Sequence, residues 1–539
     1  MTAPLTRRAF LERLGAAGGS AAVLQGALAL GLTPWSAHAS PVLKSLPRGE
    51  GRSVVLLGAG MSSLAACLEL ERAGFKCTIL EASHRVGGRN LTLRSGDLID
   101  EMGHQRRCGF DDEPHLYLNA GPARIPAHHR LLLHYCRTLG VELEPFINVN
   151  YNAWVHDAKA FGGQRIRQRR ILADARGFIT ELMGKSAHSA AFDEAFSADD
   201  LEKFMAFLRS YGDLDPNLVY RGSSRAGYQA PGVGAPTAGM LEPGALQPKL
   251  DFSEILKSDF WAEKMHFGEG EDHAAPLLQA RGGMDRIVRA FLREIRSPMR
   301  LHAAVQRLRV SGEGVEVIYQ QHGELHHLRA DYCLNSIPAQ LLVGLDHNFP
   351  SRYAEGLGSL ERSGAFKLGI QMSERFWEEE SIYGGISWSS QPIEQVWYPP
   401  HGTHLASGIM QAAYTYDPRK SEYWARMDPR TRYETGLDQL AKLHPQVRNH
   451  AGAFVSVAWE RMNHQLGCVS LWSQEARDRY FRYLQQPLHG RHLMMGDQMS
   501  YHPGWQEGAL SSAHHALGEL ARVASASRDR PRPAMEASS

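Results

Sequence analysis

A glycine turn after the apolar run Val54–Leu57 has the residue types and spacing of a dinucleotide-binding motif. Gly58 allows a sharp turn out of a strand, and Gly60 lets a pyrophosphate approach the backbone. A helix that begins near Met61 would offer free N–H groups and the positive end of its dipole to the phosphates. Glu81 follows at the distance expected for a carboxylate that binds a ribose. The turn therefore predicts a site for NAD or FAD, between which it does not decide.

Two further details belong to the same predicted site. The third glycine position of the motif is Ser63, which is small enough for a helix to pack closely on a sheet. Gly87 and Gly88 form a second glycine turn, and Arg89 follows them as a cation.

A rigid loop carries one arginine between two prolines. In Gly121–Pro126 the prolines fix the backbone on both sides of Arg124. A guanidinium held in this way can bind a carboxylate through two parallel hydrogen bonds. The loop alone equally fits a structural arginine paired with a buried acid.

A C-terminal glycine-rich turn precedes a last predicted helix. Asp497 stands at a predicted strand end, where it can accept hydrogen bonds near a ribityl or pyrophosphate group. Small residues in Gly504–Ala509 surround the start of the helix, which is again favourable for an anion. Trp505 fits either a core position or the wall of a ligand pocket.

Composition excludes several other classes of protein. The chain has 539 residues, with 59 Lys and Arg against 58 Asp and Glu, so no nucleic-acid surface is indicated. No internal apolar run reaches the length of a membrane span. The six cysteines lack the spacing of a zinc site or a disulfide framework. Adjacent histidines such as His128 and His129, on a helix, would not share a face and are expected to be surface or packing residues rather than metal ligands.

The first 39 residues have the pattern of a twin-arginine signal peptide. Arg7 and Arg8 precede a mildly apolar stretch from about Leu14 to Leu32, and Ala37–Ala39 is a small-x-small cleavage site. An amphipathic N-terminal helix is the alternative. The signal predicts cleavage after Ala39 and a periplasmic or secreted protein that passes the twin-arginine translocase folded, with its cofactor loaded. Residues 524–539 are expected to be a disordered tail.

The element pattern predicts a mixed fold. It is α/β plus α+β, with a Rossmann-like nucleotide domain, a second mixed-sheet domain and a helical insertion. Helices are expected at His128–Leu139, within Phe178–Tyr211, at Met284–Ile295 and at Pro429–Leu443, the last with Asp428 as N-cap. Strands are expected as a pair within Leu301–Tyr319 and at Leu328–Asn335, Phe366–Met372 and Ser407–Tyr414.

The motifs together resemble the FAD-dependent amine oxidases, and among them the L-amino acid oxidases most closely. The resemblance rests on the glycine turn, Glu81, GGR, GPARIP, the lysine in FKLGIQM and GWQEGAL, and it extends from about Ser53 to Leu517. It implies FAD as the cofactor. The expected FAD-binding segments are 50–127, 275–325 and 451–523, with a helical domain at 128–260 and a substrate-binding domain at 326–450.

The resemblance also implies roles for individual residues. The cofactor would be bound by Gly58, Gly60, Met61, Ser62, Ser63, Glu81, Ala82, Arg89, Gly121, Pro122, Ala123, Arg124, Val305, Trp459, Asp497, Gly504, Trp505, Gln506, Glu507, Gly508 and Ala509. Arg124 and Tyr414 would bind the substrate carboxylate, the Gly504 carbonyl the amine, and Trp505 would flank the reacting carbon. Tyr416 competes with Tyr414 for its place. Lys367 would hold a water near the flavin, although the sequence by itself favours a solvated strand-edge lysine.

The implied activity is oxidative deamination of an L-amino acid by oxygen, which yields a 2-oxo acid, ammonia and hydrogen peroxide. The family also implies a homodimer. Three alternatives stay open: an oxidase of amines or polyamines, a decarboxylating amino-acid monooxygenase, and a non-catalytic flavin-binding export factor.

Overall fold

The computed structural model describes residues 46–186, 197–229 and 244–526. The predicted signal peptide and most of the predicted tail lie outside these residues. The last helix, α17 (Gln506–Ala526), runs past the predicted start of the tail, and Ala524 is fully buried on it. Among the described helices, none is long and apolar enough to cross a membrane.

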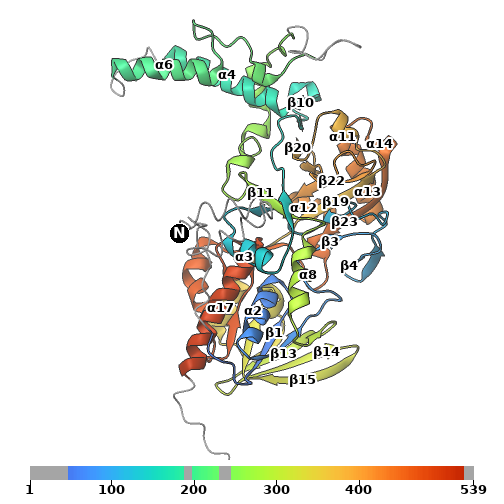
Figure 1. Cartoon of the computed structure of the whole chain (residues 1–539), viewed down its shortest axis with the longest axis vertical. Coiled ribbons are helices and arrows are strands. Elements are labelled where there is room, and N and C mark those ends of the chain that lie inside the picture. The colour runs from blue at the N-terminus through green and yellow to red at the C-terminus, as the bar shows by residue number, and fades with distance from the viewer. Residues whose placement is uncertain (1–45, 187–196, 230–243, 527–539) are drawn as a thin grey trace, which may run out of the picture.

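A five-stranded parallel sheet forms the centre of the lower half of the molecule (Figure 1). Its order is β12 (Met299–Arg300), β2 (Lys76–Leu80), β1 (Ser53–Leu57), β16 (Tyr332–Asn335) and β25 (His492–Met494). One face packs against the apolar sides of α2 (Met61–Arg72), α3 (Arg130–Thr138), α8 (Asp285–Glu294) and α17. Parallel strands need such covering helices, because both faces of the sheet must be buried.

A smaller sheet and two helices cover the other face of the parallel sheet. The order of the smaller sheet is β15 (Glu324–Ala330), β14 (Val315–Gln321), β13 (Ala304–Val310) and β17 (Asp346–His347). With it pack α9 (Ala339–Leu342) and α10 (Ser351–Gly358). The single strand predicted at Leu328–Asn335 is two strands, because the chain leaves β15 at Asp331 and enters the parallel sheet. There the Asp331 carboxylate accepts a hydrogen bond from the Ser53 amide at 2.7 Å.

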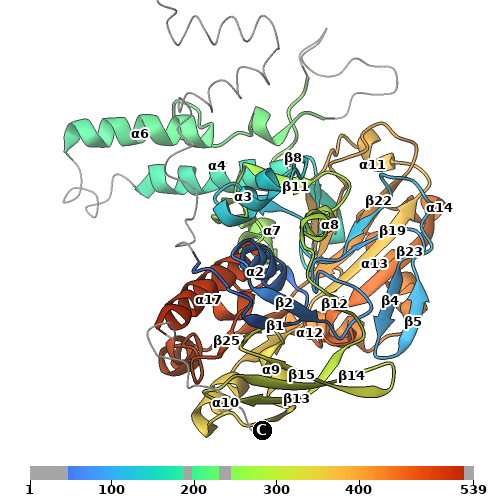
Figure 2. The same ribbon diagram turned by 60° about the horizontal axis from the view of Figure 1, so that its bottom comes forward.

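The second large sheet has seven strands (Figure 2). Its order is β10 (Arg165–Arg167), β9 (Trp154–His156), β20 (Ile386–Ser389), β21 (Gln395–Trp397), β22 (Gly408–Thr415), β19 (Phe366–Met372) and β23 (Ala451–Ala458). It packs on α12 (Pro418–Ala425) and α13 (Pro429–Leu440). Asp428 caps α13 as predicted, accepting hydrogen bonds from Arg430 and Thr431.

Shorter elements connect these layers. A three-stranded sheet orders β7 (Ile125–Pro126), β11 (Leu277–Ala280) and β8 (Leu143–Pro145). Strand pairs join β3 (Thr92–Leu93) to β6 (Leu118–Asn119), β4 (Leu98–Glu101) to β5 (His104–Arg107), and β18 (Glu361–Ser363) to β24 (Val469–Leu471). The remaining short helices are α7 (Phe252–Lys257), α11 (Phe376–Glu379), α14 (Val447–His450), α15 (Gln474–Ala476) and α16 (Arg482–Leu484).

Helices α4 (Gln168–Ser186) and α6 (Ala198–Gly212) pack together and extend away from both sheets (Figures 1 and 2). The sheets cut across the predicted segment boundaries. Strand β16, within 326–450, belongs to the parallel sheet, whereas β9, β10 and β23 belong to the seven-stranded sheet. The chain therefore passes between the two sheets more often than the predicted domain segments imply.

Candidate active site

A cavity of about 610 Å³ lies where the carboxyl ends of the parallel strands meet the seven-stranded sheet. Residues that follow three of these strands line it, namely Gly58 after β1, Glu81 after β2 and Ser336 after β16. The crevice outside the carboxyl ends of parallel strands is the usual ligand site of such sheets. Its volume is within the range of about 300–1,000 Å³ that is typical of small-molecule and cofactor sites.

Gly58 and Gly60, the two glycines of the first turn, are required for different reasons. Gly58 has a φ of +87°, and a Cβ built on it would lie 2.6 Å from the Ser336 hydroxyl, so a side chain is excluded by the protein itself. At Gly60 a Cβ would have no protein atom within 4 Å, although the residue lines the cavity. Gly60 is also the N-cap of α2 and provides no side-chain hydrogen bond to the helix. The turn thus leaves room and helical N–H groups for a ligand.

Glu81 is buried at the edge of the cavity and holds the turn in place. One carboxylate oxygen accepts a hydrogen bond from the Ala59 amide at 2.7 Å, and the other accepts one from the Ser83 amide at 2.8 Å. Each oxygen keeps a second lone pair. Glu81 therefore fixes the backbone beside Gly60 and still has acceptor capacity toward the cavity.

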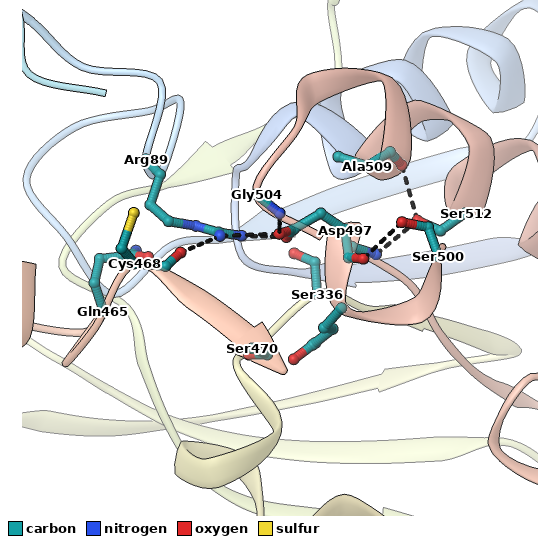
Figure 3. A network of polar contacts seen from close by, with 12 residues as sticks. Arg89, Ser336, Gln465, Cys468, Ser470, Asp497, Ser500, Gly504, Ala509 and Ser512 are labelled. Carbon is teal, nitrogen blue, oxygen red and sulfur yellow. Dashed lines mark hydrogen bonds and ion pairs between the residues drawn. The ribbon is translucent and has the colours of Figure 1, made fainter. Parts of the chain in front are cut away.

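An ion pair between Arg89 and Asp497 joins the N-terminal and C-terminal glycine turns (Figure 3). The guanidinium contacts both carboxylate oxygens and also the Cys468 carbonyl, and Asp497 accepts a hydrogen bond from the Gly504 amide at 2.7 Å. Burial disfavours the charged form of both groups, but the attraction and hydrogen bonds between them are stronger than this effect. The pKa of Arg89 is therefore raised and that of Asp497 is lowered. The pair is charged and fixes Gly504 against the cavity.

Lys367 lies inside the cavity wall. It is only 4% exposed, and its Nζ donates hydrogen bonds to the carbonyls of Asn119 at 2.9 Å and Gly121 at 2.7 Å. Burial, with a smaller contribution from the charge of Arg124, lowers the pKa of Lys367 to about 7. The expectation from sequence alone, a solvated strand-edge lysine, is wrong. Strand β19 lies between β22 and β23, and all seven of its residues are buried.

Arg124 stands beside this cavity among aromatic rings. Its guanidinium carbon is 5.0 Å from the centre of Trp397, 5.4 Å from Phe267 and 5.5 Å from Trp505. Its Nε is buried without a hydrogen-bond partner, and no carboxylate among the described residues pairs with it. By contrast, the buried Arg432 donates to both oxygens of Glu101. Arg124 therefore lacks the acid that a structural arginine of this kind has.

Tyr414 lines the cavity between Lys367 and Arg124. It is paired in register with Lys367 across β22 and β19, and the lysine Nζ lies 4.6 Å from the centre of its ring. Its hydroxyl has no hydrogen-bond partner among the described residues. Tyr416 is 47% exposed and does not line the cavity. The geometry thus favours Tyr414 over Tyr416 as the tyrosine of the site.

His128 and His129 converge on one carboxylate, contrary to the sequence-based expectation. The Nε2 atom of each ring lies 2.9 Å from the same oxygen of Asp272. The prediction that the two side chains share no face was wrong because α3 begins at Arg130, so both residues precede the helix and the rule for helical neighbours does not apply.

The chain matches the model of the flavin containing amine oxidoreductase family over residues 61–517. The chain belongs to this family. Curated relatives include an L-amino-acid oxidase of Siganus canaliculatus, 26% identical over 474 residues that cover 87% of this chain and 85% of the relative. A flavin-dependent L-tryptophan oxidase of Lentzea aerocolonigenes is 27% identical over 499 residues, covering 88% of this chain and 98% of that enzyme.

Solved structures of flavin amine oxidases share the fold. Wild-type putrescine oxidase bound to putrescine has a TM-score of 0.57 and 18% identity, covering 87% of this chain and 99% of that chain. Cyclohexylamine oxidase from Brevibacterium oxydans has a TM-score of 0.57 and 17% identity, with coverages of 88% and 100%. The predicted fold class is thus confirmed, and the protein is an FAD-dependent oxidoreductase.

The cavity has the donor and acceptor groups that FAD requires. Asn90 Oδ1 and Gln506 Nε2 are buried in its wall without hydrogen-bond partners. A buried polar atom without a partner is costly, so these atoms indicate a missing polar ligand. Together with the open space at Gly60 and the uncapped start of α2, they fit a dinucleotide.

Most residues that were predicted to bind the cofactor line this cavity. These are Gly58, Gly60, Met61, Ser62, Glu81, Ala82, Arg89, Gly121, Pro122, Val305, Trp459, Asp497, Gly504, Gln506 and Ala509. Trp459 is fixed there by a 3.0 Å hydrogen bond from its Nε1 to the Ala120 carbonyl.

Other predicted cofactor residues do not line the cavity. Ser63 hydrogen-bonds the Ser336 hydroxyl at 3.0 Å and packs α2 on the sheet. Glu507 accepts hydrogen bonds from the amides of Leu131 and Leu132 and so caps α3. At Gly508 a Cβ would lie 2.2 Å from the His502 carbonyl, so this glycine serves close packing. Ala123, Arg124 and Trp505 do not line the cavity either. The last two belong to an aromatic cluster, which consists of Phe267, Trp397 and Trp505 around the Arg124 guanidinium.

Several lining residues were missed. Asn90 could have been predicted, because it directly follows the GGR turn. Ser336, Arg362 and Cys468 have no recognisable motif, and only the fold places them in the cavity wall. The aromatic cluster was missed for the same reason. His273 also belongs to it, 4.3 Å from Phe267 between ring centres, and burial together with the charge of Arg124 lowers the pKa of His273 to about 4. Its imidazole is therefore neutral at pH 7.

Replacement of Glu81 tests the cofactor end of the site. Glu81→Ala removes two backbone contacts of the turn, each worth about 1.5–3 kcal/mol for a charged acceptor, and we expect the affinity for FAD to fall by at least about tenfold. The ratio of flavin to protein absorbance after gel filtration measures this. Glu324→Ala, at an exposed position on β15, is the control. Full FAD content in Glu81→Ala would contradict the assignment.

Proposed function

We propose that this enzyme is an L-amino acid oxidase. The observation that carries the proposal is the Arg124 guanidinium, which is enclosed by three aromatic rings and has no paired acid among the described residues. A pocket cation without a counter-ion is a desolvation burden unless the substrate supplies the anion. An α-amino acid supplies a carboxylate, whereas a simple amine does not.

Three groups are placed to hold an amino acid at both of its polar ends. Arg124 can bind the carboxylate through a planar pair of hydrogen bonds, and the free hydroxyl of Tyr414 stands near it. The Gly504 carbonyl accepts no hydrogen bond from the described residues, and it is held in place because the amide of Gly504 donates to Asp497. We assign it to the substrate amine. Two-point binding orients the Cα–H bond, which is the main contribution of such contacts to the rate.

The surroundings of these groups favour the neutral amine that the reaction needs. Trp505, Phe267 and the neutral His273 surround the substrate with rings, and a desolvated site disfavours the ammonium form. FAD supplies the redox chemistry when it is bound. Lys367, which is buried and whose pKa is lowered to about 7, can hold a water or exchange a proton at its Nζ.

The names of the relatives agree with this proposal. The curated proteins of Siganus canaliculatus and Lentzea aerocolonigenes are an L-amino-acid oxidase and an L-tryptophan oxidase. The solved structures are oxidases of amines, but their low identity bears on the fold alone.

Reduction of the flavin without air tests the proposal. An L-amino acid should bleach the yellow enzyme, whereas its D-enantiomer and a diamine should not. In air, a peroxide-coupled assay over the common amino acids should then give the preferred side chain and a 2-oxo acid product. Bleaching by amines alone would favour the amine oxidase. An amide product would indicate a decarboxylating monooxygenase, and bound FAD without any turnover would indicate the export factor.

We also propose that the enzyme is a homodimer exported by the twin-arginine translocase, with cleavage after Ala39. The support is the Arg7-Arg8 pair and the apolar stretch behind it. Replacing both arginines by lysines should leave active, FAD-loaded enzyme in the cytoplasm, because the substitution changes only the export signal and not the folded enzyme. Activity assays of periplasmic and cytoplasmic fractions measure this, and unchanged periplasmic activity would refute the export proposal.

A further inference from the structure

Two imidazoles and a carboxylate meet at a point that lies outside the FAD cavity. Among the described residues, His128, His129 and Asp272 form a group whose ligand atoms all lie within 4.8 Å of one another. The Nε2 atoms of both rings already point at one oxygen of Asp272, each at 2.9 Å. None of the groups assigned to FAD or to the amino acid belongs to this cluster.

The backbone brings these residues together through a strand pair. His128 and His129 follow β7, and Asp272 precedes β11 by a short turn. In the antiparallel pairing Leu277 lies opposite Pro126 and Leu278 opposite Ile125. The His129 amide also donates to the Pro126 carbonyl at 3.0 Å, which fixes the chain directly after the strand. The strand pair therefore brings the turn that holds His128 and His129 close to the turn that holds Asp272.

We propose that His128, His129 and Asp272 form a binding site for a divalent transition-metal ion, Zn²⁺ in particular. Imidazole nitrogen and carboxylate oxygen are ordinary zinc ligands, whereas Ca²⁺ and Mg²⁺ prefer oxygen alone. A tetrahedral ion with bonds of about 2.0–2.2 Å needs its ligand atoms about 3.3 Å apart. The three atoms reach this spacing by small side-chain rotations, and water would complete the coordination.

The surroundings of the site carry charges of both signs and limit its affinity. The Glu507 carboxylate interacts with His128 from the start of α17, whereas the Arg124 guanidinium interacts with Asp272 and opposes a bound cation. However, the Nδ1 atom of His129 is buried and has no hydrogen-bond partner. Metal-binding histidines usually donate this second N–H to an acceptor, and loss of such a partner costs about 10–100-fold in affinity. We therefore expect an exchangeable, micromolar site rather than a permanent structural one.

The site is coupled to the substrate pocket by direct packing. The ring of His129 meets Trp505 edge-on with 5.1 Å between ring centres, and His273, next to Asp272 in the chain, lies 5.9 Å from the same tryptophan. An ion at the cluster would fix the position of His129, which packs against Trp505. Trp505 in turn contacts Arg124.

Calorimetric titration of the tag-free, FAD-loaded enzyme with ZnCl₂ tests the proposal. We expect one ion per chain with micromolar affinity, and Co²⁺ in its place should give the visible absorption of a bound tetrahedral ion. Asp272→Asn keeps the shape of the side chain, and His128→Ala removes the more exposed imidazole. Each should weaken binding by at least about tenfold.

His327→Ala is the matched control, because His327 also contacts a carboxylate, Glu316, but without a second histidine at that carboxylate. It should bind Zn²⁺ as the parent does. The FAD content of every variant reports that it is folded, and the titration does not depend on which substrate is oxidised. No saturable binding by the parent, or equal affinity in Asp272→Asn and His128→Ala, would overturn the proposal.

Discussion

Arg124→Ala should lose most of its catalytic efficiency toward L-amino acids while it keeps its FAD. The substitution removes a charge-assisted contact to the substrate carboxylate, worth about 1.5–3 kcal/mol per hydrogen bond. We therefore expect kcat/KM to fall by about tenfold to a hundredfold or more, as measured by peroxide release. Arg124→Lys should recover little, because a point charge does not reproduce the planar guanidinium. FAD should remain bound, because Arg124 lies outside the wall of the cofactor cavity.

Arg352→Ala provides the control for the loss of charge and of a cation–ring contact. Arg352 is exposed and lies 4.7 Å from the centre of Tyr483, and neither residue lines the cavity. Its activity should equal that of the parent. If Arg124→Ala also oxidises L-amino acids at the parental rate, the carboxylate assignment is wrong and the amine oxidase alternative becomes preferable.

Lys367→Met should reduce kcat by about a hundredfold or more, the usual contribution of a positioned proton-exchanging group. Because the pKa of Lys367 is lowered to about 7, its neutral fraction rises as the pH passes through this value. The parent should accordingly show an inflection of kcat near pH 7 that Lys367→Met lacks. Lys442→Met, at an exposed position after α13, should retain both the rate and the inflection. Parental activity in Lys367→Met would refute the role.

Lys367→Met should lower activity but raise the stability of the folded protein, because it removes the cost of burying a charged group. The pKa of Lys367 is about 7 in the folded protein and 10.5 in its ordinary range, so between these values the unfolded chain binds one more proton. Stability from this group therefore rises with pH across that window, and the cost of burying the lysine is greatest below pH 7. The melting temperature of Lys367→Met relative to the parent, both with FAD, should be highest at pH 7 and below and decline toward pH 10. A constant difference would show that the lysine does not titrate in this window.

The cofactor end of the site was predictable because local sequence determines it. Gly58, Gly60 and Glu81 act through backbone geometry and through a neighbouring strand, and these follow from a strand-turn-helix pattern. The resemblance added Lys367 and Tyr414, which lie on the other sheet, and Trp459, which directly follows its strand β23; all three line the cavity. Without it, the sequence predicts a solvated strand-edge lysine at position 367, because a single strand does not reveal that both of its faces are covered.

Two features lay beyond sequence reasoning for a different reason. Phe267 and Trp397 surround Arg124 from segments far apart in the chain, and neither has a spacing that indicates a ligand. The convergence of His128 and His129 depended on where α3 begins, and a helix boundary placed two residues too early gave the wrong directions for their side chains. Small boundary errors are harmless for a fold class but not for the direction of a side chain.

The order in which the parallel sheet is assembled also restricts when the cofactor can enter. Gly496, Asp497 and the start of α17 are the last parts of the cavity wall to be synthesised, more than 400 residues after Glu81. Until this segment has been made, Arg89 lacks its ionic partner Asp497 and the wall of the cavity is incomplete. The complete FAD site can therefore form only after nearly all of the chain has been synthesised.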